Sequence, residues 1–102
     1  STLDRSSAAS DVYKRQIRDQ LIRKNRDPEL WLLLSEIQRA GQNIIGYHQS
    51  RAEYFLLLGQ NEKALNQLEF ALQLTQNNFQ VSERIMTKIV DIKKVLNSSR
   101  GL

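Results

Sequence analysis

The chain has 102 residues, of which 40% are hydrophobic, and this content supports one small core and makes a second independent domain unexpected. Its 15 Lys and Arg residues outnumber its 11 Asp and Glu residues, and the absence of cysteine excludes both a disulfide framework and a thiolate metal site. The longest apolar runs, at 30–34 and 54–58, are far too short to cross a bilayer, so we expect no membrane span.

The opening residues, 1–16, are small and polar and have little apolar periodicity, and the character of the sequence changes at Ile17. The string SSAASDVYKRQ, at 6–16, resembles a translated adapter-like segment that recurs at the ends of reading frames assembled from environmental DNA. We therefore interpret residues 1–16 as a non-native segment, with a natural flexible N-terminus as the alternative. In either case Ser10 is placed to cap a helix that begins at Asp11. Because the chain starts with Ser and a polar stretch, we interpret it as a fragment or a processed form.

The first apolar stripe starts at Ile17 and ends before the sequence NRDP. A second helix is predicted over 28–40, because Asp27 supplies an N-cap and Pro28 suits the first helical position. This helix stops at Gly41, which we expect in the left-handed conformation.

Three further helices are predicted. The third runs from about 44 to 58, ends at Gly59, and is apolar over more than one stripe, as expected of a helix that packs on two sides. The fourth spans about 61–75 and takes Asn61 as its N-cap. The fifth has a single apolar stripe, made of Val81, Ile85, Ile89, Ile92 and Leu96.

Helices joined by short connections are typical of antiparallel hairpins stacked side by side. The sequence therefore predicts an all-α fold of about five helices, with a helical-repeat domain over 17–97. Residues 98–102 are expected to form a frayed tail.

The third and fourth helices resemble one tetratricopeptide unit, a repeat of about 34 residues with a glycine near its turn. With Gly59 as that glycine, small residues fall at Ala52, Ala64 and Ala71, and Phe55 takes the aromatic position. Small side chains let the two helices approach closely, while Phe55 fills the gap between hairpins. The resemblance implies a tetratricopeptide-like stack. Three positions depart from the repeat: His48, Arg51 and Gln76.

Two longer strings, RAEYFLLLGQNEKALNQLEFALQL at 51–74 and SERIMTKIVDIKK at 82–94, are similar to the C-terminal end of a protease family. This family comprises the periplasmic His-Glu-x-x-His zinc metalloproteases related to the β-barrel assembly-enhancing protease. The resemblance implies a periplasmic accessory role in outer-membrane protein assembly or quality control. The partner it implies is a protein or peptide, either the family's own protease domain or the outer-membrane assembly machinery.

His48 is the only histidine, so no His-Glu-x-x-His pair is present and we expect neither protease activity nor a cofactor or metal site in this chain. By resemblance, zinc belongs to a catalytic domain outside it. We interpret His48 itself as a structural residue at a packing position.

The candidate partner-binding residues lie on the third helix and are Gln49, Arg51, Glu53 and Leu56. This helix is expected to line the concave side of the stack, and Gln49, Glu53 and Leu56 fall outside its packing stripe. Arg51 replaces an apolar residue and needs a carboxylate, a carbonyl or an aromatic face. Its partner is either structural, such as a helix end, Glu36 or Glu69, or a bound ligand.

Other functions remain open. A free-standing helical-repeat adaptor would use the same fold equally well. Basic residues crowd 14–26, but arginine clusters without interleaved aromatics are typical of solvated helix faces, so we expect no nucleic-acid partner.

A truncated repeat array exposes the face that its missing neighbour covered, so we predict self-association through the helix from Ile17 and the flank of 28–40.

Overall fold

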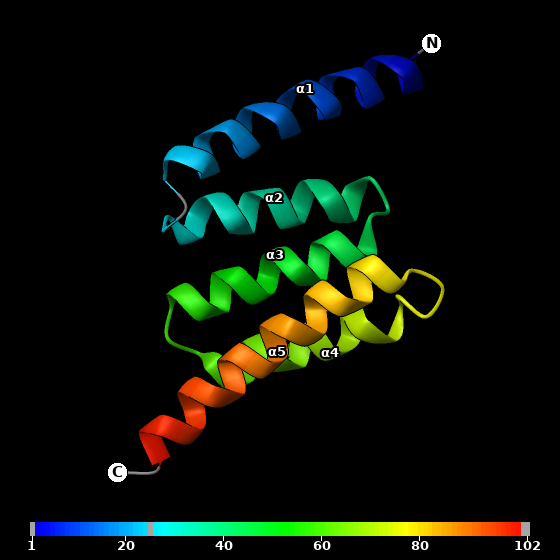
Figure 1. The fold of residues 1–102 in the computed structure, drawn as a ribbon. Coiled ribbons are helices and arrows are strands. Elements are labelled where there is room, and N and C mark those ends of the chain that lie inside the picture. The colour runs from blue at the N-terminus through cyan, green and yellow to red at the C-terminus, as the bar shows by residue number, and fades with distance from the viewer. Residues whose placement is uncertain (1, 25, 101–102) are drawn as a thin grey trace.

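The computed structural model describes the backbone of residues 2–24 and 26–100, with the side chains of 12, 14–24 and 26–98. This part of the chain is helical, as predicted, with short turns between the helices (Figure 1). The helices are α1 (Thr2–Arg23), α2 (Pro28–Ala40), α3 (Ile44–Leu57), α4 (Asn61–Gln73) and α5 (Phe79–Arg100).

The helices form a stack in which each packs mainly on its neighbours in the chain. Figure 1 shows α1, α2 and α3 as successive layers, with α5 crossing in front of α4. The molecule measures 58 × 31 × 18 Å, and its radius of gyration is 15.0 Å. A compact domain of this length would have a radius of gyration of about 13 Å, so the stack is elongated.

The start of α1 differs from the prediction. The helix begins at Thr2 and continues without a break past Ile17, so Ser10 lies inside it and is not an N-cap. At the next turn the prediction is confirmed. The carboxylate of Asp27 accepts a hydrogen bond of 3.0 Å from the backbone N–H of Glu29, and Pro28 takes the first position of α2.

The turn between α2 and α3 corrects the expectation for Gly41. Gly41 has a φ of −86°, and Gln42 is the residue in the left-handed conformation, with a φ of 63°. The left-handed residue is displaced by one position because Gly41 still donates its N–H to the carbonyl of Ile37, as a helical residue does. Asn43 then caps α3 by accepting a hydrogen bond of 3.0 Å from the N–H of Gly46.

The turn between α3 and α4 uses glycine as predicted, since Gly59 has a φ of 76°. The predicted N-cap of α4 is wrong, because Asn61 is the first residue of the helix and Gln60, which makes no side-chain capping bond, precedes it. α4 ends at Gln73, two residues before the predicted end, and α5 continues to Arg100 through part of the expected tail. Residues 101 and 102 lie outside the described residues.

The larger core joins α3, α4 and α5. Ala52, Ala64 and Ala71 are completely buried in it, in agreement with their predicted packing role. Phe55 is half-buried against the same core, whereas Gly59 is exposed and serves the turn. The remaining buried members of this core are Leu68, Ile85, Ile89 and Ile92.

A smaller core joins α1 to α2. Ile17 and Leu21 of α1 are buried against Leu34 of α2, with Trp31 packed beside them. The buried polar residues of α2 and α3 are Ser35, Gln38 and Ser50, and Gln38 is hydrogen-bonded to Ser50 across the two helices. The structure therefore has two apolar cores, and a buried polar pair joins α2 to α3.

Candidate functional site

The central groove is a hollow of about 300 Å³ that takes residues from every helix of the stack. Its walls come from one side of α1, α2 and α3 and from the side of α5 that faces them. Its lining residues are Arg18, Trp31, Leu34, Gln38, Gly46, Gln49, Ser50, Glu53, Leu68, Arg84, Ile85 and Lys88.

The floor of the groove is built by a close approach of α2 to α3. A Cβ atom at Gly46 would lie 2.6 Å from the amide nitrogen of Gln38, so glycine leaves the space that this side chain occupies. Gln38 in turn accepts a hydrogen bond of 2.6 Å from the hydroxyl of Ser50. Because both side chains are buried, this bond fixes the polar floor.

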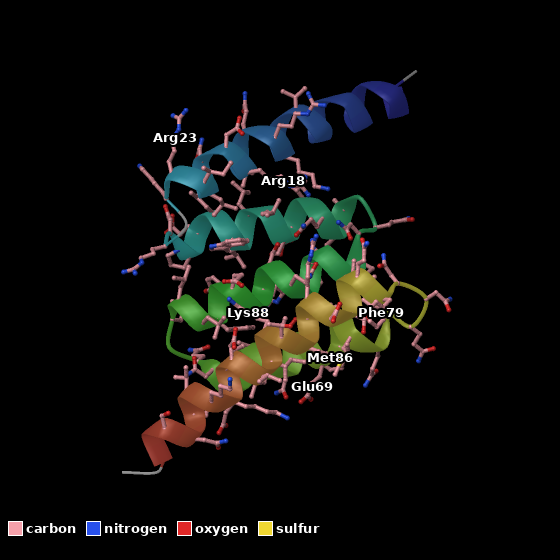
Figure 2. The ribbon with its side chains drawn as sticks, in the orientation of Figure 1. Arg18, Arg23, Glu69, Phe79, Met86 and Lys88 are labelled. Carbon is pink, nitrogen blue, oxygen red and sulfur yellow. The ribbon has the colours of Figure 1, made fainter. Side chains whose placement is uncertain are left out.

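The rim of the groove is positive. It carries the cations Arg18, Arg84 and Lys88 against the single carboxylate of Glu53. Lys88 binds Glu53 at 3.1 Å and so ties α5 to α3, but within the described side chains neither Arg18 nor Arg84 is paired with a carboxylate. Figure 2 shows Arg18 on the side of α1 that faces α2 and Arg23 on the far side. The two unpaired guanidinium groups are available to an anionic ligand.

The structure brings two of the four candidate binding residues together. Gln49 and Glu53 line the central groove on α3, one helical turn apart. Leu56 lies instead in a separate hollow with residues of α5 and packs against the larger core. Arg51 does not line the groove.

Arg51 has a structural contact with aromatic faces. Its guanidinium carbon lies 5.6 Å from the ring centre of Tyr47 and 5.3 Å from that of Phe55. The contact is therefore with an aromatic face, one of the three kinds of partner expected from the sequence, and not with Glu36 or Glu69. Glu36 binds Arg39 at 2.8 Å, and this hydrogen bond, with the charge of Glu36, raises the pKa of the Arg39 guanidinium.

His48 also has structural contacts, as predicted. Its Nδ1 forms a hydrogen bond of 2.8 Å with the side-chain oxygen of Gln67 on α4, and its ring stacks on Phe70 with centres 5.5 Å apart. The ring of Tyr47 approaches it edge-on from α3. These contacts join α3 to α4.

Sequence reasoning missed the cations and the floor of the groove. Arg84 and Lys88 alternate with buried isoleucines on α5, and no local pattern indicates that this helix returns to α3. Gly46 did offer a signal, because a glycine inside a helix often marks a close approach of another group.

The described residues contain no group of three or more His, Cys, Asp or Glu side chains placed to hold a metal ion. The same part of the chain has no helix long and apolar enough to cross a membrane. Comparison with models of protein families, with curated proteins and with solved structures gives no match.

Proposed function

We propose that this chain is a non-catalytic, protein-binding helical-repeat domain whose central groove holds an acidic segment of another protein. The observation that carries the proposal is the convergence of Arg18 and Arg84, which pair with no carboxylate among the described side chains, on one hollow with a buried polar floor. Stacked helices offer such concave surfaces to peptides, and opposite charge steers a ligand into them.

The groove also suits the apolar part of a peptide. Three helices contribute apolar side chains to the groove, beside its cations. These side chains are Trp31, Leu34, Leu68 and Ile85. A ligand with an acidic residue next to an aromatic or aliphatic one would match both features. Such a combination of one buried anchor and a few charged contacts is common in peptide recognition.

Selection from a displayed library of random peptides tests this proposal without assuming a ligand. We expect the enriched peptides to share acidic residues beside an apolar residue. They should bind the wild-type chain and lose affinity for an Arg84→Glu variant, whose charge opposes theirs. Enrichment of basic peptides, or equal binding to both forms, would contradict it.

For the biological context, we infer that the chain is the C-terminal accessory part of a periplasmic zinc metalloprotease acting in outer-membrane protein assembly or quality control. The support is the resemblance over 51–74 and 82–94, together with the burial of all three alanines at repeat positions. On this proposal, the groove captures or orients substrate for the protease domain, or docks on the assembly machinery.

Sequencing the source DNA upstream of the Ile17 codon tests the context. We expect an open frame that encodes a His-Glu-x-x-His helix and a signal peptide, with residues 1–16 foreign to it. A start codon just before Ser1, with genomic opening residues, would contradict the protease context and favour a free-standing helical-repeat adaptor.

A further inference from the structure

The outward face of α5 carries an apolar stripe that the molecule itself does not cover. Phe79, Met86 and Val90 are 77%, 53% and 48% exposed. They lie along one hollow of α5, and Glu83 and Lys94 line the same hollow. Figure 2 shows Phe79 and Met86 on α5, which crosses in front of α4. We name these five residues the α5 stripe.

The spacing of the α5 stripe suits a second helix. Its members follow one another at steps of four, three, four and four residues, which keeps them on one side of a helix. The opposite side, with Ile85, Ile89 and Ile92, is already used in the larger core. Apolar residues at steps of three and four form the seam by which paired helices interlock.

The charges of the α5 stripe are arranged for self-pairing. Glu83 and Lys94 lie on either side of Met86 and Val90, and each is about 8 Å along the axis from the midpoint between residues 88 and 89. A two-fold axis at that midpoint sets Glu83 of one helix opposite Lys94 of an antiparallel copy. The same operation brings Met86 of each copy beside Val90 of the other, so the stripe is complementary to itself.

We propose that α5 pairs with α5 of a second copy in an antiparallel, two-fold symmetric dimer. This contact lies on the outward side of α5, away from the central groove, and leaves the groove open. It also differs from the contact predicted from the sequence. Ile17 and Leu21 are buried inside the molecule, so among the described side chains of α1 Ile22 is the most exposed apolar residue.

Sedimentation equilibrium of the full chain over a wide concentration range tests the dimer. We expect the wild-type mass to approach twice that of the monomer, and Met86→Lys to remain monomeric. The matched control is Ile22→Lys, which adds the same charge at another exposed apolar residue and should leave the dimer intact. Both residues are exposed, so both variants should keep the helical circular dichroism of the wild type.

Exchanging the charges of Glu83 and Lys94 tests the alignment of the two α5 helices in the dimer. Glu83→Lys alone should raise the Kd of the dimer roughly tenfold, because two symmetric pairs become repulsive, and Lys94→Glu in the same chain should restore it. Three results would each overturn the proposal: a wild-type chain that stays monomeric, dissociation by Ile22→Lys instead of Met86→Lys, or no recovery in the double variant.

Discussion

Gly59 and Gly41 both follow helices, but only Gly59 needs to be glycine. Its φ of 76° places it in the left-handed conformation, and no atom lies within 4 Å of the position where a Cβ would stand. The constraint on Gly59 is therefore conformational and not steric. Gly41 has an ordinary φ of −86°, and the nearest atom to its Cβ position is a carbonyl oxygen at 3.5 Å.

Alanine at these two positions should consequently give opposite results. We expect Gly59→Ala to lower the free energy of unfolding by about 1–2 kcal/mol, the cost of the left-handed conformation for an L-residue. Gly41→Ala should leave it unchanged or raise it slightly, because alanine restricts the unfolded chain. Urea denaturation of both variants measures the difference, and a larger loss for Gly41→Ala would contradict the turn geometry.

The role of Arg51 can be decided by separating stability from binding. Its contacts with Tyr47 and Phe55 predict that Arg51→Ala lowers the free energy of unfolding by about 1 kcal/mol. Because Arg51 does not line the central groove, the affinity for a groove-selected peptide should not change. A lower affinity with unchanged stability would show that Arg51 contacts the partner.

At the scale of the helices, the start of α2 combines a side-chain N-cap, a proline at the first position and an acidic residue in the first turn. Asp27 accepts a hydrogen bond from Glu29, and its negative charge interacts favourably with the helix N-terminus. The same helix carries Trp31 and Leu34, which line the central groove. The sequence predicted the cap because all of its components lie within three residues.

Removal of this cap should therefore be measurable. We expect Asp27→Ala to lower the free energy of unfolding by about 1 kcal/mol, and Asp27→Asn, which keeps an oxygen acceptor, to lower it by less. Thermal unfolding followed by circular dichroism measures both variants. Equal losses for alanine and asparagine would contradict a role for the hydrogen bond.

The helices were predictable from the sequence, whereas the groove was predictable only in part. α4 and α5 each bury a stripe of apolar residues at steps of three and four, and this local pattern predicts where they form. Gln49 and Glu53 were found because they lie beside the packing stripe of α3. The pairing of Glu53 with Lys88 was not, because it joins residues 35 positions apart and depends on how α5 crosses the stack. Arg18 and Arg84 were missed for the same reason.

Across the whole molecule, the two cores differ in size. Among the side chains that the structure describes, the smaller core, between α1 and α2, buries three apolar residues, whereas the larger core buries seven. In a stack held by contacts between neighbours, the end with less buried apolar surface opens more easily.

Hydrogen exchange should show this gradient. We expect the amides of α1 to exchange faster than those of α4, whose Ala64, Leu68 and Ala71 are buried in the larger core. Mass spectrometry of peptides produced after timed exchange measures the rates. Equal protection of α1 and α4 would show that the stack unfolds as one cooperative unit.

The most direct test of the central groove compares two arginines on α1. Arg18 lines the groove, whereas Arg23 is exposed on the far side of the same helix (Figure 2). Fluorescence anisotropy would measure the affinity of a selected acidic peptide for Arg18→Glu and Arg23→Glu, which change the net charge equally. We predict that Arg18→Glu raises the Kd roughly tenfold or more and that Arg23→Glu has little effect. An equal loss in the two variants, or no loss in Arg18→Glu, would contradict a ligand site in the central groove.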